Sequence, residues 1–254
     1  MELKIVEEYC QKLRMFGMKE YLEQRVSQAE QDAIAYPEFL SLVLQDELQT
    51  RQAKQIASRI KQARFEEEKT FEALDKKRYP TKVQRILREI STLGFLKHKK
   101  NVIIMGPTGT GKSHVAQALG FQACLQGKSV RFIRANQFYR ELNASRADDS
   151  WEKTFKQFIR KEILIIDDFG LKGLNHQQAD DIYELIAERH HKGGMIFTSN
   201  RSCDAWVKLF PDQVLSNAAL DRLANTSYQI ILEGESYRKK MRPNLDIDLE
   251  GGLM

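Results

Sequence analysis

The sequence predicts an α/β domain with a mainly parallel, buried sheet, preceded by a region that is entirely helical. From about Thr81 onward, short apolar runs rich in β-branched residues alternate with segments of helical periodicity, as in sheets covered by helices. From Leu3 to about Arg78, apolar residues recur at helical spacing instead. We therefore expect two domains, at residues 1–78 and 79–254.

Composition is typical of a protein that folds in water. The chain has 254 residues, of which 42% are hydrophobic, enough for one large domain and a smaller one. No apolar stretch approaches the roughly 18 to 20 residues that cross a bilayer, and the charged start Met1-Glu2-Leu3-Lys4 is unlike a secretory signal. We expect a cytoplasmic protein with no membrane partner. A net charge of +5 mildly favours a polyanionic partner.

A long helix is expected in the second half of the N-terminal region. Pro37 suits the first turn of this helix, which we expect to run into the sixties. We expect its buried face to carry Leu40, Val43, Leu44 and Leu48.

The C-terminal half of that helix is basic, since no acidic residue occurs between Glu47 and Glu66. Helical spacing puts Arg51, Lys54 and Lys61 on one side. A helix with a basic face can follow a phosphate backbone, although a solvated face explains the same pattern. The candidate DNA-binding residues here are Arg51, Lys54, Arg59 and Lys61.

Five runs in the second region have the composition of buried strands. Helical segments separate them, which leaves room for the crossovers that parallel strands require. The expected strands are Asn101 to Met105, Ser129 to Ile133, Glu162 to Ile166, Gly194 to Ser199 and Tyr228 to Leu232.

A glycine-rich loop with the spacing G-x-x-x-x-G-K-S follows the first expected strand. Glycines let the backbone N–H groups and the N-terminus of the next helix surround a phosphate. We expect Lys112 to reach the β and γ phosphates of ATP, and the Ser113 hydroxyl to ligate Mg²⁺. The expected nucleotide-binding residues are Gly106, Pro107, Thr108, Gly109, Thr110, Gly111, Lys112, Ser113 and His114.

Two acids end the third expected strand, at the edge of the sheet where parallel-sheet proteins bind ligands. We expect Asp167 to hold Mg²⁺, directly or through water, and Asp168 to orient or deprotonate the attacking water. The fourth expected strand ends in Thr198-Ser199-Asn200. If this strand lies between the first and the third, Asn200 can position a water near the γ phosphate.

Two arginines stand downstream in Leu220-Asp221-Arg222-Leu223 and Ser236-Tyr237-Arg238. An arginine can fork onto a phosphate from the same or a neighbouring subunit, although ordinary salt bridges explain such residues equally well.

Together these motifs resemble the AAA+ ATPases of the IstB/DnaC-like family, and most closely its IstB branch, the ATP-binding helper proteins of insertion sequences. The resemblance covers nearly the whole chain and implies a AAA+ P-loop core with a parallel five-stranded sheet behind a small helical domain. Its most specific segments are Gly106 to Ser113, Leu164 to Gly170, Thr198 to Arg201, Leu220 to Leu223 and Gly234 to Arg238.

The resemblance also implies roles for single residues. It makes Asn200 the first nucleotide sensor, Arg222 a finger that reaches the ATP of a neighbouring subunit, and Arg238 the second sensor. These roles imply a homo-oligomer with ATP at its subunit interfaces. Because many AAA+ proteins have Glu where this chain has Asp168, we expect hydrolysis to be slow. Family members carry an extra helical element that lines a DNA channel, expected here around residues 137–158, with Arg140, Arg146 and Lys153 as candidate contacts.

The leading functional hypothesis is an ATP-dependent regulator that assembles on duplex DNA and assists a transposase. A second hypothesis is a replicative-helicase loader, whose helical region grips a helicase instead of DNA. A third, a phosphate-loop kinase for a small molecule, lacks an evident substrate lid and leaves Arg222 and Arg238 unexplained.

Overall fold

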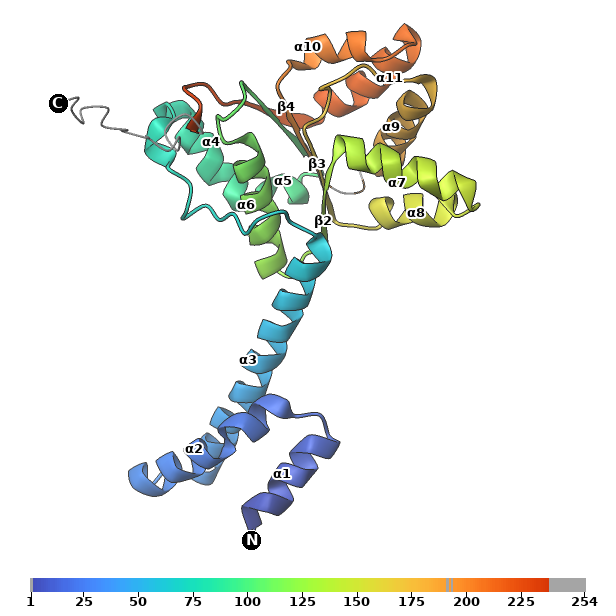
Figure 1. Cartoon of the computed structure of the whole chain (residues 1–254). Helices are drawn as coiled ribbons and strands as arrows, with labels where there is room; N and C mark the ends of the chain where they lie inside the picture. Colours follow the sequence, from blue (N-terminus) through green and yellow to red (C-terminus); the bar gives the residue numbers. More distant parts are fainter. Residues whose placement is uncertain (1, 191, 193, 238–254) are drawn as a thin grey trace, which may run out of the picture. The chain divides into compact units, whose positions relative to one another are not determined.

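The computed structural model describes residues 2–190, 192 and 194–237 (Figure 1). The chain divides into two compact units between Lys61 and Gln62. The first unit is helical and the second is α/β, in the order that the sequence predicts. Residues 62–78, which the sequence groups with the helical region, cluster with the α/β unit.

Three helices make up the first unit. The amide of Gly17 at the start of the second helix donates to the buried carboxylate of Glu47 at 2.7 Å. A Cβ on Gly17 would lie 2.4 Å from Oγ1 of Thr50, so only glycine lets the two helices approach this closely. The helices are α1 (Glu2–Lys12), α2 (Phe16–Asp32) and α3 (Tyr36–Ala63).

The covered face of α3 differs from the expected one. Val43 is buried, but Leu40, Leu44 and Leu48 are 53%, 43% and 60% exposed. The expectation was wrong for these three leucines because α2 approaches α3 at Glu47 and Thr50. These residues lie about a quarter turn around the helix axis from the expected face. Periodicity shows which residues share a face, but it does not show which face a neighbour covers.

The second unit contains a five-stranded sheet in the order β2-β3-β4-β1-β5, and every pairing is parallel. This confirms the predicted sheet and places β4 between β1 and β3. Three of the strands lie within one residue of their expected bounds, and the other two match them. The strands are β1 (Asn101–Met105), β2 (Val130–Arg134), β3 (Ile163–Asp167), β4 (Gly194–Ser199) and β5 (Ser227–Ile231).

Helices cover both faces of the sheet. On one face lies α6 (Lys112–Leu125), which contacts the four strands β1 to β4. The other face packs against α7 (Ala135–Ala147), α8 (Trp151–Ile159), α9 (His176–Arg189) and α11 (Gln213–Ala224). The remaining helices are η1 (Lys76–Arg78), α4 (Thr81–Ser91), α5 (Gly94–Lys97), α10 (Cys203–Trp206) and η2 (Val207–Leu209).

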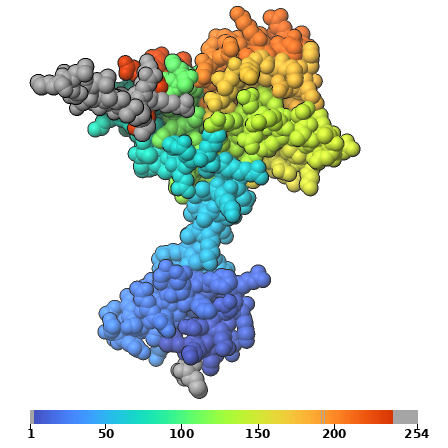
Figure 2. Space-filling model, in the orientation of Figure 1, coloured from blue at the N-terminus to red at the C-terminus, as the bar shows by residue number. Residues whose placement is uncertain are grey.

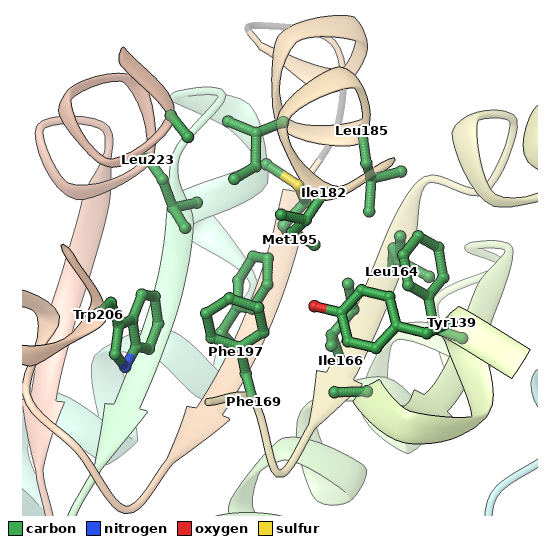
Figure 3. Close-up of a cluster of buried hydrophobic side chains, with 14 of the residues drawn as sticks. Tyr139, Leu164, Ile166, Phe169, Ile182, Leu185, Met195, Phe197, Trp206 and Leu223 are labelled. Carbon is green, nitrogen blue, oxygen red and sulfur yellow. The ribbon is translucent and has the colours of Figure 1, made fainter. Parts of the chain in front are cut away.

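Aromatic side chains fill the core between the sheet and the second helical layer (Figure 3). The ring of Phe169 lies edge-on to Phe197 at 5.3 Å and to Trp206 at 4.7 Å, measured between ring centroids. Because Phe169 directly follows the acidic pair of β3, this packing fixes the strand end that carries the two carboxylates. Among the described residues, no helix is long and apolar enough to cross a membrane.

Candidate nucleotide-binding site

The glycine-rich loop lies between the end of β1 and the start of α6. Gly106 and Gly109 have φ angles of +147° and +83°, values that other residues rarely adopt. A Cβ on Gly106 would lie 2.1 Å from the carbonyl oxygen of Leu232, and one on Gly109 would lie 2.0 Å from Oγ of Ser236. The loop therefore requires glycine at both positions, for its backbone conformation and for the close approach of the chain after β5.

The cationic side chain of the loop is enclosed. Lys112 is buried in the first turn of α6, and its Nζ donates to the carbonyl oxygen of Pro107 at 2.9 Å. The hydroxyl of Thr110 donates to the same carbonyl at 2.9 Å. In the same turn, Nε2 of His114 lies 2.8 Å from the carbonyl oxygen of Thr70, and burial lowers the pKa of the His114 imidazole. The ammonium group of Lys112 and the N-terminus of α6 therefore face the space that the loop encircles.

The two acids of β3 sit beside that loop. Asp167 is 2% exposed, and its carboxylate accepts a hydrogen bond from the hydroxyl of Thr198, whose oxygen in turn accepts from the Asp168 amide at 2.9 Å. Burial raises the pKa of Asp167, as does the charge of Asp168, whereas hydrogen bonds from Thr198 and Ser113 lower it. Hydroxyl and carboxylate oxygens are hard ligands, and the buried negative charge favours a cation, so Ser113 and Asp167 fit Mg²⁺.

The backbone turns sharply directly after the strand. Asp168 has a φ of +56°, in the left-handed region that residues other than glycine seldom occupy. Such strain is common at functional sites, where surrounding packing holds it in place. Here Thr198 bonds to the Asp167 carboxylate and to the Asp168 amide, and the ring of Phe169 packs against Phe197, which keeps Asp168 at the carboxyl edge of the sheet.

Asn200 reaches the loop from the end of β4. Its Nδ2 donates to Oγ1 of Thr108 at 3.3 Å. This contact follows from the strand order, since β4 lies between the strand that precedes the loop and the strand that carries the acids. The structure thus brings Asn200, the loop and the two acids to one edge of the sheet, as the sequence predicts.

Two further segments close the loop, and of these the sequence singled out only the one that contains Tyr237. The hydroxyl of Tyr79 donates to the carbonyl oxygen of Thr110 at 2.7 Å, and the amide of Tyr237 donates to that of Gly109 at 2.9 Å. Between them, the guanidinium of Arg78 donates to the carbonyl oxygen of Glu235 at 2.5 Å. No motif marks Arg78 and Tyr79, because their position beside the loop arises only from folding.

The structure describes only the first of the two downstream arginines. Arg222 donates from Nη1 to the hydroxyl of Tyr183 at 3.0 Å, and its guanidinium lies 5.4 Å from the centre of that ring. Arg222 is thereby held on the outer layer formed by α9 and α11. Arg238 lies outside the described residues.

The candidate DNA contacts of the α/β unit also have different surroundings. Arg146 pairs with the buried carboxylate of Asp181 at 2.5 Å and lies 5.1 Å from the centre of the Trp151 ring. Arg140 is exposed and lines an open cavity of about 630 Å³ between α7 and the start of α9. Lys153 is exposed on α8. Arg146 therefore has a structural partner, and its contact with DNA stays a prediction.

In the helical unit, the basic side chains of α3 make local contacts. Arg51 pairs with Glu47 at 2.5 Å, and Nζ of Lys54 lies 4.9 Å from the centre of the Phe16 ring. Arg59 reaches Gln55 at 3.5 Å, and Lys61 is exposed. Arg51, Lys54 and Lys61 are exposed and Arg59 is half-buried, so DNA contact by these side chains also stays a prediction. Figure 2 shows the surface of the helical unit in blue.

Solved structures share this fold. The DnaC helicase loader matches with a TM-score of 0.52 and 18% identity, over 60% of this chain and 89% of that one. DnaI matches with a TM-score of 0.54 and 18% identity, over 65% and 91% of the two chains. AMPPCP-bound DnaA from Aquifex aeolicus matches with a TM-score of 0.53 and 19% identity, over 65% and 50%. At these identities the likeness shows the AAA+ P-loop fold alone.

Sequence relatives are more similar. An insertion-sequence ATP-binding protein of Mycobacterium tuberculosis is 37% identical over 91% of this chain and 92% of its own length. One from Geobacillus stearothermophilus is 34% identical, over 92% and 93% of the two chains. The sequence model of the IstB-like ATP binding protein family matches residues 9–244. The chain therefore belongs to the family of IstB-like ATP binding proteins.

Proposed function

We propose that the protein is a Mg²⁺-dependent ATPase that assembles on duplex DNA as a homo-oligomer and assists a transposase. The observation that carries the proposal is the meeting of Lys112, Asp167, Asp168 and Asn200 at one edge of the sheet, around a loop that requires glycine. Family membership supports ATP binding, and the insertion-sequence names of the relatives support the link to transposition.

Each side chain has a distinct task in the proposed reaction. Lys112 and the amides at the start of α6 bind the phosphates and offset their charge. Ser113 and Asp167 hold Mg²⁺, which supplies further positive charge at the phosphates. Asp168 accepts a proton from the attacking water or orients it, and Asn200 positions the same water. The hydrogen bond from the Asp168 amide to Thr198 holds the backbone that carries this carboxylate.

The proposed oligomer completes the site with Arg222 of a neighbouring subunit. A test mixes two inactive variants, Lys112→Ala and Arg222→Ala. In a mixed assembly some interfaces combine an intact loop with an intact Arg222, so turnover should return to about a quarter of the wild-type rate at equal mixing, as random pairing gives for a site shared by two subunits. If mixing restores nothing while each variant still assembles, Arg222 does not act across an interface.

The choice between duplex DNA and a helicase partner rests on the similarity of the relatives. The insertion-sequence proteins are 34% to 37% identical over more than nine-tenths of the chain, whereas the helicase loader is 18% identical over 60%. A direct test measures ATP turnover with duplex and with single-stranded DNA of equal length. Preferential stimulation by duplex DNA agrees with the proposal, and preferential stimulation by single strands argues for a loader.

A further inference from the structure

Basic side chains gather at the amino edge of the sheet, opposite the edge that carries the nucleotide site. All pairings are parallel, so the five strands begin at this same edge. Before β2, Lys128 pairs with Glu162 at 2.9 Å. Before β4, Lys192 pairs with Glu188 at 3.0 Å. Within residues 2–190, 192 and 194–237, no carboxylate pairs with the other five basic side chains, which we call the basic edge: Lys97, Lys99, Lys100, Arg160 and Lys161.

The segments that form this edge are bonded to one another. The guanidinium of Arg189, which is 1% exposed, donates to the carbonyl oxygens of Lys161 at 2.7 Å and of Gly194 at 2.9 Å. It thereby ties the segment before β3 to the start of β4. A Cβ on Gly194 would lie 2.5 Å from Cδ2 of Leu96, so the turn before β1 also packs against the start of β4. The basic edge is therefore one fixed surface.

Arg189 adds a buried positive charge beneath this edge. Burial lowers the pKa of Arg189 to about 10, so its guanidinium stays charged at neutral pH. Among the described residues, its hydrogen bonds go to backbone carbonyls and none goes to a carboxylate. Two of these carbonyls, those of Phe158 and Ile159, end α8. Because Arg189 already satisfies this helix end, Arg160 and Lys161 are not needed to offset its dipole.

Lys99 occupies a backbone position that favours glycine. Its φ is +51°, in the left-handed region, and its side chain is exposed. The amide of Lys99 donates to the carbonyl oxygen of Leu96 at 3.0 Å, and the amide of Lys100 donates to that of Phe95 at 2.9 Å. This is the pattern in which glycine commonly ends a helix. A lysine costs conformational energy here, so the geometry of the turn does not account for its ammonium group.

The row of charges has the length of a short stretch of nucleic acid backbone. At the usual spacing of strands, the four strand starts from β2 to β1 span about 15 Å. One strand of duplex DNA carries a phosphate every ~3.4 Å along the helix axis, or about four over that length. Lysine and arginine side chains that contact phosphates position a duplex without reading its sequence. The basic edge therefore fits a phosphate backbone of any sequence.

We propose that the basic edge binds the phosphate backbone of duplex DNA, so that nucleotide and DNA occupy opposite edges of one sheet. DNA bound there leaves the carboxyl edge open to ATP. The buried charge of Arg189 also attracts the phosphates, because a charge in the protein interior is screened less than one in water. This inference rests on the proposed assembly on duplex DNA and names the surface that the DNA contacts. An acidic face of a partner protein is the other occupant that the test distinguishes.

The test measures binding of a labelled duplex by fluorescence anisotropy, with the full chain in ATP and at several salt concentrations. The triple variant Lys97→Gln/Lys99→Gln/Arg160→Gln should bind at least about 10-fold more weakly. It should also lower the dependence of log K on log salt by about three, one for each lost phosphate contact. Its affinity for ATP should change less than about twofold, because the two sites lie at opposite edges.

A matched pair of single variants controls for net charge. Lys99→Gln and Lys208→Gln each remove one exposed lysine, but Lys208 lies in η2, outside the basic edge. Lys99→Gln should lower the salt dependence by about one, and Lys208→Gln should leave it unchanged. Equal effects of the two would mean that only net charge matters, which would overturn the proposal.

Two further measurements separate DNA contact from folding. Glycine relieves the strained backbone, so Lys99→Gly should unfold a few degrees above the wild-type protein although it binds DNA more weakly. In the wild-type protein, duplex DNA should protect Lys99 from acetylation by an activated ester and leave Lys208 unprotected. Equal reactivity of Lys99 with and without bound DNA contradicts the contact.

The outcomes also separate this inference from the proposed function. If wild-type protein and triple variant bind duplex DNA equally well, the inference alone fails. If the triple variant keeps DNA binding but loses binding to the transposase, the basic edge takes an acidic protein face instead. If the wild-type protein binds no duplex DNA, the proposed function fails, and the basic edge loses its ligand with it.

Discussion

The two units of the chain differ in how much of their apolar surface they bury. Among the described residues, eleven of the exposed large hydrophobic side chains lie between Leu3 and Leu48, and six lie in the α/β unit, which is about three times as long. The buried hydrophobic residues of the helical unit are Cys10, Leu22 and Val43. In the α/β unit, a continuous core supports the site, whereas in the helical unit polar contacts such as Glu47 to Gly17 hold the helices together. Stability and chemistry should therefore respond to different substitutions in the two units.

The largest expected effect is the difference in unfolding free energy between a substitution in the core and one at an exposed position. Phe197→Ala removes a fully buried ring between Phe169 and Trp206 and should lower the free energy of unfolding of the α/β unit by about 3–5 kcal/mol. Leu44→Ala, at a half-exposed position on α3, should cost less than about 1 kcal/mol. Urea unfolding followed by circular dichroism measures both. Equal costs would mean that Leu44 is covered in the protein in solution.

Loss of the loop lysine should affect the site and leave the helical unit unchanged. Lys112→Ala should weaken binding of ATP with Mg²⁺ by about 100-fold, because a buried, charge-assisted contact to the phosphates is removed. Calorimetric titration with ATP measures this effect, and the helical circular dichroism signal serves as the control. Retention of wild-type affinity would place the nucleotide elsewhere.

Acid should weaken the helical unit first. The hydrogen bond from Arg25 holds the pKa of Asp46 below its ordinary range. Burial raises the pKa of Glu47, but hydrogen bonds from the Met18 amide, from Arg51 and from the Gly17 amide outweigh it and leave the pKa lowered. A lowered carboxyl pKa gives stability that is present above the unfolded value near pH 4 and lost as the pH falls through the folded value.

The pKa of Asp167 is shifted in the opposite direction. Because burial raises this pKa, protonation of Asp167 relieves the cost of its buried charge. Both tryptophans, Trp151 and Trp206, lie in the α/β unit, so their fluorescence reports on that unit alone. On acidification below pH 4, helical circular dichroism should decrease before tryptophan fluorescence changes. Asp46→Asn should remove part of the early loss. A fluorescence change that comes first would contradict this difference between the units.

The smallest expected effect concerns two arginines of α7. Arg140→Gln should weaken duplex DNA binding a few-fold and lower the dependence of log K on log salt by about one, as for one lost phosphate contact. Arg146→Gln should instead lower the free energy of unfolding, because it leaves the buried Asp181 carboxylate without its ion pair. Filter binding at several salt concentrations and thermal unfolding distinguish the two. The reverse result would assign the phosphate contact to Arg146.

The sequence predicts which residues lie at the carboxyl edge of the sheet because each of these segments has a local cause. An apolar run with β-branched residues forms a buried strand, and the chain's own sequence determines that Asp167 ends it and Asp168 follows. Strand order is not local, which is why the position of Asn200 depended on β4 lying between β1 and β3.

Other features required the folded chain. Tyr79 contacts the loop from 31 positions away in the sequence, and Arg134 meets Glu66 from 68 positions away. Neither pair carries a motif or a fixed spacing, so nothing local indicates the contact. The same holds for Leu44, since periodicity alone could not show that α2 covers a different face of α3.

In the proposed function, ATP binding at this site assembles the protein on duplex DNA. The most direct measurement is sedimentation of the full chain with long duplex or single-stranded DNA, in ATP and in ADP, with Lys112→Ala as the control. The account predicts large complexes with duplex DNA in ATP, which ADP and Lys112→Ala both abolish. Assembly on single strands only would contradict the duplex DNA claim in favour of a helicase loader, and no sedimentation with either DNA would contradict both.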